Sequence, residues 1–222
     1  MKQLYSVFKD AKVAPMVRQL SWSHCLLLLP LKSIDKIYYY ASKTANKNLS
    51  KRQLEEIIKA REYERLPIET KSKLISEVKV DVKELVPNPI LIRNKNNIEI
   101  VTEKALHSLI LEDIESFMKE LGNSFSFIGS EYKIKIDGKN NYIDLLLFNY
   151  EYNCFVVVEL KITELRKEHI GQIQIYMNYI DKHLKSINQD KTIGIIICKR
   201  DNKYIIEYAT DERIISRTYE LL

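Results

Sequence analysis

Three charged residues lie in or at the end of two apolar segments, where a charge is costly. Asp144 interrupts the apolar stretch Tyr142–Phe148. The next apolar stretch ends with Glu159 and Lys161. A buried charge destabilises a protein unless it is paired or bound to a metal ion. If the intervening turn closes symmetrically about residues 151–152, Asp144 lies directly opposite Glu159, with Cβ atoms about 5 Å apart.

Two carboxylates and an ammonium group on one face of a hairpin could hydrolyse a phosphodiester. Lys161 points to the same face as Glu159, because side chains alternate along a strand. Neighbouring carboxylates repel unless a cation or a proton lies between them, and Mg²⁺ prefers one or two protein carboxylates, several waters and a substrate phosphate. Such an ion polarises the phosphodiester and acidifies its bound water, while Lys161 places the nucleophile or stabilises developing charge.

The alternative for Glu159 and Lys161 is an ordinary ion pair at the exposed end of a strand. That alternative is the better one for any Glu-x-Lys triplet taken alone, since such triplets are common on exposed strands. The coincidence with Asp144 in the neighbouring strand favours a site. We therefore predict that Asp144 and Glu159 bind Mg²⁺, or Mn²⁺ in its place, with Lys161 beside them.

Two helical segments add candidate residues. Glu103 precedes Leu106 and Ile110 at helical spacing, which places it on the buried stripe of its helix. A role in the site and an interaction with the helix dipole are both open for Glu103. Gln172 and Tyr176 lie one turn apart in a second helix and share a face. Taken alone, these two are ordinary half-buried helix residues.

The elements that must position these residues follow an α/β pattern. An amphipathic stripe predicts one helix over 102–121, ended by Gly122. A meander followed by a helical crossover into an apolar, parallel strand predicts a mixed sheet with helices on both faces. The remaining predicted elements are strands over 131–136, 142–148 and 154–160 with a turn at Asp137-Gly138, a helix over 168–184, and strands over 192–198 and 204–208.

The first third of the chain is helical and basic. Apolar residues recur at helical spacing from Ile34 to Leu66, and Asn48-Leu49-Ser50 supplies an N-cap for the second helix. Between Lys32 and Arg65, nine Lys/Arg accompany five Asp/Glu. This suits either a solvated helical face or a module that binds a phosphate backbone. We expect three parts: a basic helical region over 1–66, a proline-containing linker over 67–99, and an α/β domain that carries the candidate site over 100–222.

The composition excludes several classes of protein. With 222 residues, of which 45% are apolar, the chain is neither a disordered tail nor a disulfide-stapled miniprotein. Five glycines and five prolines argue against a turn-rich β-sandwich and against glycine-rich phosphate loops. The net charge of +5 permits a nucleic-acid partner without requiring one. Three distant cysteines indicate reduced thiols in a cytoplasmic protein, and the apolar run 25–31 is too short to span a membrane.

The candidate site and its surroundings resemble a known nuclease superfamily. Asp144, then Glu159-Leu-Lys161 fifteen residues later, then Gln172 and Tyr176, resemble PD-(D/E)xK nucleases with the QxxxY motif of RecB-like members. Further segments are similar to the YhcG-type family: Gln19–His24, Leu54–Ile58, Phe117–Gly122, Phe125–Gly129, Tyr142–Phe148, Val157–Lys161 and Ile193–Cys198.

This resemblance implies a restriction-endonuclease-like fold, in which a mixed β-sheet is flanked by helices and preceded by a small all-helical region. It implies a metal at Asp144 and Glu159, Lys161 as the catalytic lysine, and additional site residues at Glu103, Gln172 and Tyr176. Ile143 stands in place of the motif's proline, and the helical region is expected to be a shortened form of the family's DNA-binding domain. The implied partner is DNA in restriction, mobile-element or repair contexts; a homodimer and a subunit of a larger DNA-processing complex are both open.

Two functions are consistent with these observations. The first is a divalent-metal-dependent DNA endonuclease, whose cleavage would disappear in Asp144→Ala. The second is a non-catalytic nucleic-acid-binding or interaction module with a nuclease-like fold, whose salt-dependent DNA binding would be indifferent to the loss of Asp144 or Glu159. The complete set of two carboxylates and a lysine favours the enzyme.

Overall fold

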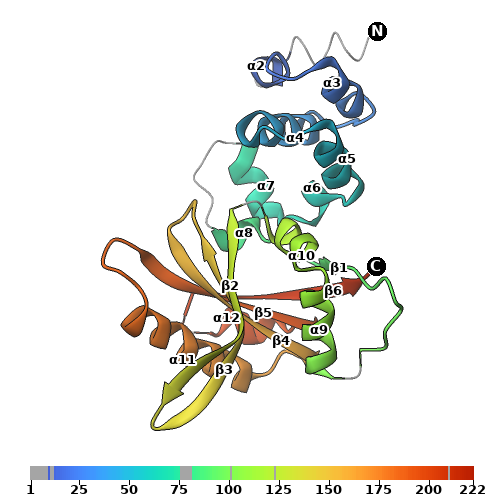
Figure 1. The fold of residues 1–222 in the computed structure, drawn as a ribbon. Helices are drawn as coiled ribbons and strands as arrows, with labels where there is room; N and C mark the ends of the chain where they lie inside the picture. Colours follow the sequence, from blue (N-terminus) through green and yellow to red (C-terminus); the bar gives the residue numbers. More distant parts are fainter. Residues whose placement is uncertain (1–9, 11–12, 76–81, 101, 123, 210) are drawn as a thin grey trace. The chain divides into compact units, whose positions relative to one another are not determined.

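The computed structural model of the chain describes residue 10 and residues 13–75, 82–100, 102–122, 124–209 and 211–222 (Figure 1). The chain forms two compact units, Met1–Val80 and Asp81–Leu222. Among the described helices, none combines the length and the hydropathy needed to cross a lipid bilayer. Cys25, Cys154 and Cys198 are buried free thiols.

The N-terminal unit is helical, as predicted. A capping box starts α5: Ser50 Oγ accepts the N–H of Gln53, and Gln53 Oε1 accepts the N–H of Ser50. Asn48 ends the preceding helix in the left-handed conformation, with φ 49°. The described helices are α2 (Val13–Val17), α3 (Trp22–Leu28), α4 (Ile34–Lys47), α5 (Lys51–Lys59), α6 (Glu62–Arg65) and α7 (Ile68–Ile75).

Carboxylates engage part of the basic surface of this unit. Lys36 pairs with Glu64 and Lys43 with Glu62, which also accepts the hydroxyl of Tyr39. Arg52 and Lys59 each pair with a glutamate one helical turn away. These pairs reduce the positive charge available to a phosphate backbone, so they favour the solvated-face interpretation for this part of the unit. DNA binding by residues 1–66 stays a prediction.

The second unit contains a mixed six-stranded sheet in the order β1-β6-β5-β4-β3-β2. Strands β2, β3 and β4 form the predicted antiparallel meander, and β4, β5, β6 and β1 pair in parallel. The hairpin turn lies at Asp137 and Gly138, both of which have positive φ. The strands are β1 (Ile90–Ile92), β2 (Phe125–Ile136), β3 (Lys139–Asn149), β4 (Cys154–Glu164), β5 (Asp190–Arg200) and β6 (Ile214–Leu221).

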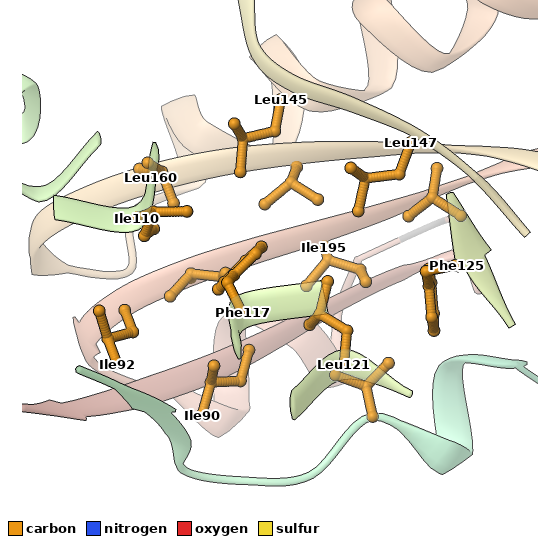
Figure 2. Packing of buried hydrophobic residues seen from close by; sticks show 14 of the residues in the cluster. Ile90, Ile92, Ile110, Phe117, Leu121, Phe125, Leu145, Leu147, Leu160 and Ile195 are labelled. Carbon is orange, nitrogen blue, oxygen red and sulfur yellow. The ribbon is translucent and has the colours of Figure 1, made fainter. Parts of the chain in front are cut away.

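Helices pack on both faces of this sheet, which confirms the predicted fold class. One apolar cluster joins α9 (Glu103–Glu112) and α10 (Ile114–Leu121) to side chains such as Leu147 and Ile195 (Figure 2). A second cluster joins α11 (Lys167–His183) to the other face, where Val157 and Ile196 lie. Because β4 alternates strictly between the two clusters, each of its side chains has a defined layer.

Two predicted elements differ from the structure. The single helix over 102–121 is divided at Asp113, whose carboxylate accepts the N–H of Ser116 and caps α10. Both helices bury the same stripe, so the periodicity continues across the break. The strand predicted over 204–208 is helix α12 (Lys203–Glu207), which packs Ile205 and Ile206 against the α11 cluster. A short apolar run cannot distinguish helix from strand by its periodicity.

The last strand and the first strand of the sheet were missed by the sequence patterns. Strand β6 has no apolar alternation, because Ser216 and Thr218 follow Ile214 on the same face, and it becomes a strand by pairing with β5 and β1. Strand β1 and the helices α7 and α8 (Val82–Leu85) lie in the stretch 67–99 that was predicted as a linker. Three residues of β1 carry too little periodicity to identify a strand.

Candidate active site

The hairpin that carries the candidate site has the predicted register. Leu145 pairs with Val158 and Leu147 with Val156, as expected for a turn centred between residues 151 and 152. Asn149 stabilises this turn, because its side-chain oxygen accepts two backbone N–H groups of the turn, each at 3.1 Å. Followed outward from the turn, the regular pairing of β3 with β4 ends at Leu145. Asp144, the next residue outward, is not paired with β4.

Strand β3 is irregular at Asp144, which is paired with neither neighbouring strand. On the β2 side, only the pair of Asp144 with Glu131, which has φ 46°, is missing, and the pairing continues in the same register. Ile143 packs in the α11 cluster, whereas Leu145 packs in the α9–α10 cluster. Residues two apart in a regular strand share a face, so the strand turns over at Asp144. The Asp144 carboxylate therefore projects from a part of β3 that lies outside the regular strand pairing.

The Asp144 carboxylate accepts a hydrogen bond from a backbone N–H group of β4. Its Oδ2 accepts the N–H of Leu160 at 2.7 Å, an amide that would oppose Ile143 if the register continued. Burial raises the pKa of Asp144, and the Leu160 hydrogen bond and the charge of Lys161 oppose that rise. This arrangement explains why the ladder ends here and holds the carboxylate between the two strands.

Glu159 is the most deeply buried ionisable group of the site. Its side chain is 2% exposed, and its Oε1 has no hydrogen-bond partner among the described residues. Burial and the negative charge of Asp144 raise the pKa of Glu159 to about 8, although Lys161 opposes this rise. An orphaned, buried carboxylate oxygen beside a second carboxylate is a position where a cation would be favourable.

Lys161 lies between two carboxylates. Its Nζ is 3.4 Å from Glu159 Oε2 and 3.4 Å from Glu103 Oε2. Burial lowers the pKa of Lys161, but the charges of Glu159, Glu103 and Asp144 outweigh it and leave the pKa above its ordinary value. The ammonium group therefore stays charged at neutral pH. Glu103 is 46% exposed at the first position of α9, so it contacts the site from an exposed position and not from the buried stripe.

The donor set fits a divalent cation bound by two carboxylates. Among the described residues, no group of three or more His, Cys, Asp and Glu side chains is arranged to hold a metal. Asp144 and Glu159 together match the one or two protein carboxylates that Mg²⁺ uses, the remaining positions being water or phosphate oxygens. Lys161 contacts both Glu103 and Glu159, but Glu103 lies at an exposed position on α9, which separates it from the buried carboxylates.

Comparison with known proteins identifies the family of the chain. Residues 84–221 match the model of the YhcG PDDEXK nuclease domain. The chain belongs to the YhcG PDDEXK nuclease family. Residues 1–65 match the DUF1016 N-terminal domain. The family predicted from the sequence is thereby confirmed.

One curated relative and two solved structures illustrate the range of similarity. "Putative nuclease YhcG" of Escherichia coli (strain K12) is 27% identical over 206 residues, which are 90% of this chain and 54% of the relative. The chain thus spans about half the length of that relative. A repair endonuclease from Pyrococcus abyssi has a TM-score of 0.37 at 18% identity, over 58% of this chain and 49% of that one. A complex of EndoMS with double-stranded DNA gives the same TM-score and identity over 58% and 48%.

The remaining predicted residues of this YhcG-family chain lie on α11. Gln172 Nε2 donates to the Tyr176 hydroxyl at 3.2 Å, so the two side chains act as one polar pair. Tyr176 is buried in the α11 cluster together with Val157. Since Val157 and Glu159 are two residues apart in β4, the α11 helix covers the face that carries Glu159 and Lys161.

Two histidines near the site were not identified from the sequence. His107, one turn after Glu103 in α9, is buried, and its Nε2 lies 3.2 Å from the carbonyl oxygen of Asp144. His169 accepts the N–H of Arg166 at the start of α11, and its pKa is lowered by burial and by the charge of Lys161. The spacing of Glu103 and His107 on one helical face was the signal that could have found His107.

Proposed function

We propose that this chain is a divalent-metal-dependent nuclease that hydrolyses phosphodiester bonds within DNA. The observation that carries the proposal is the buried Glu159 carboxylate, whose Oε1 has no partner among the described residues. Asp144 and the Lys161 ammonium group adjoin this carboxylate. Such an arrangement is unfavourable for folding alone, because it buries two carboxylates next to one another. It is favourable once a cation is shared between them.

Each side chain has a distinct part in this proposal. Asp144 and Glu159 would hold Mg²⁺ or Mn²⁺, and the ion when bound would polarise the phosphodiester and acidify a water molecule. Lys161 stabilises the negative charge that develops on the phosphate oxygens, because its ammonium group is kept charged by its carboxylate neighbours. Glu103 orients that ammonium group from the side of α9. Gln172 and Tyr176 would complete the site from α11.

The substrate and setting extend beyond the family assignment. DNA is the proposed partner, in restriction, mobile-element or repair contexts. The buried free cysteines suit a reducing compartment such as the cytoplasm. The helical N-terminal unit would contribute DNA contacts through basic residues that its internal ion pairs leave available.

The test uses the whole chain and several labelled nucleic acids. Closed circular plasmid, linear duplex, single-stranded DNA, branched DNA and RNA are incubated with Mg²⁺, with Mn²⁺ or with a chelator. Nicking or linearisation of the plasmid identifies internal cleavage. We expect cleavage only with a divalent ion, and loss of at least about 100-fold in rate for Asp144→Asn, Glu159→Gln and Lys161→Met.

A matched control keeps the test specific. Glu164→Gln makes the same chemical change at the exposed end of β4, and it should cleave at the wild-type rate. Cleavage that persists in Asp144→Asn or in chelator would overturn the proposed site. Absence of metal-dependent cleavage on every substrate, with DNA binding unaffected by Asp144→Asn, would replace the enzyme by a binding module.

A further inference from the structure

Helix α9 contacts both strands of the site where those strands separate. Glu103 Oε2 lies 3.4 Å from Lys161 Nζ on β4, and His107 Nε2 lies 3.2 Å from the carbonyl oxygen of Asp144 on β3. Residues four apart on a helix have Cβ atoms about 5–6 Å apart on one face. Adjacent strands lie about 4.8 Å apart. One turn of α9 therefore matches the separation of the two strands.

The His107 contact lies where the pairing of β3 with its neighbouring strands is irregular. Toward β4 the pairing of β3 ends at Leu145, and toward β2 only the pair of Asp144 with Glu131 is missing. A carbonyl oxygen only accepts, so His107 Nε2 carries the hydrogen of this contact. His107 is 9% exposed, and a buried imidazole held by packing supplies a fixed donor.

We propose that His107 is a positioning residue for Asp144. Its hydrogen bond to the Asp144 carbonyl oxygen fixes the backbone so that the carboxylate reaches the N–H of Leu160 and stands beside Glu159. The inference rests on the proposed function only in its consequence for metal binding by Asp144. The placement of Asp144 itself is a property of the metal-free chain and can be measured there.

Three variants separate the hydrogen bond from packing. His107→Leu removes the donor and keeps an apolar side chain in the core, whereas His107→Gln keeps an N–H donor at a similar reach. Ile110→Val, in the core three residues further along α9, removes one methylene without touching Asp144. If His107→Leu does not fold, His107→Asn takes its place, because its amide is too short to reach the same oxygen.

The first readout is amide hydrogen exchange in the metal-free protein. We expect the Leu160 amide to exchange at least tenfold faster in His107→Leu than in the wild type, because its acceptor is no longer fixed. The Leu160 amide in His107→Gln and Ile110→Val should stay within threefold of the wild type. The amide of Ile195, at the centre of β5, serves as the reference for global opening in every variant.

The second readout is Mn²⁺ binding, followed by electron paramagnetic resonance. Loss of a residue that orients a metal ligand typically weakens the metal 10- to 100-fold, so His107→Leu should show that loss and His107→Gln should not. Unchanged Leu160 exchange in His107→Leu overturns the inference, as does equal impairment of His107→Gln. If the wild type binds no Mn²⁺, the metal proposal fails, and the Leu160 exchange still decides the role of His107.

Discussion

Replacing Glu159 by glutamine should stabilise the metal-free protein at neutral and alkaline pH while it abolishes cleavage. The pKa of Glu159 in the folded chain is about 8, against an ordinary value of 4.5. Below pH 4.5 the group is protonated in both states, so it contributes no pH dependence. Between pH 4.5 and 8 the unfolded chain loses a proton that the folded chain keeps, so the free energy of unfolding falls as the pH rises.

The size of the effect follows from the same two values. At pH 7 the solution is about 2.5 pH units above the unfolded pKa, and each unit corresponds to about 1.4 kcal/mol, which gives about 3 kcal/mol. A glutamine carries no charge, so Glu159→Gln avoids this cost. Its amide oxygen can face the Lys161 ammonium group, and its NH₂ group can face the Asp144 carboxylate.

The assay is urea unfolding in chelator at pH 4.5, 6, 7 and 8, followed by far-ultraviolet circular dichroism. The free-energy difference between Glu159→Gln and the wild type should grow with each step from pH 4.5 to pH 8. Trp22, the single tryptophan, lies in the N-terminal unit, and its fluorescence reports that unit separately. Glu164→Gln should differ from the wild type by no more than about 0.5 kcal/mol.

A constant difference at all four pH values would refute the reasoning, because the stabilisation would then not arise from ionisation of Glu159. A loss of stability in Glu159→Gln at pH 8 would refute it more directly. Saturating Mn²⁺ should reverse the order of the two proteins, because only the wild type keeps both carboxylates to bind the ion.

Three further predictions concern stability. Lys161→Met leaves the Glu159 carboxylate buried without its cation and should lower the free energy of unfolding by about 3 kcal/mol at pH 8; an unchanged urea midpoint would contradict it. Asp113→Ala removes the cap of α10 and should cost about 1 kcal/mol, whereas Asp113→Asn should restore most of it in the same measurement. Gly194→Ala puts a Cβ 2.6 Å from a methionine sulfur, so it should destabilise the fold by about 1–3 kcal/mol and lower the melting temperature. Gly171→Ala, whose Cβ would meet nothing within 4 Å, should raise the melting temperature because alanine is the better helix former.

The metal-free chain can bury two neighbouring carboxyl groups because one of them gives up its charge. In the metal-free chain, Glu159 is held protonated by burial and by Asp144, so the site avoids two adjacent buried charges. Binding a divalent ion would release that proton, which links metal affinity to pH. The strands can hold this unfavourable arrangement because the apolar clusters on both faces of the sheet are extensive.

Local pattern was sufficient for the elements whose signal is strong and short in range. The hairpin register followed from the turn between Asn149 and Asn153, because side-chain hydrogen bonds in the turn set the pairing. Helix α11 followed from its periodicity, and strand β5 from its apolar run. The break at Asp113 was missed because the apolar stripe is continuous on either side of a capping residue.

The sequence by itself determined that Asp144, Glu159 and Lys161 share one hairpin and that a mixed α/β sheet surrounds them. Alternation and turn symmetry are local rules, so they act without knowledge of the remaining chain. Only the tertiary structure decided that the pairing of β3 with β4 ends at Leu145 and that Asp144 accepts the N–H of Leu160. The same holds for the contact of α9 with the carbonyl of Asp144. These features depend on contacts between residues distant in sequence, such as His107 and Asp144, whose energies no local pattern contains.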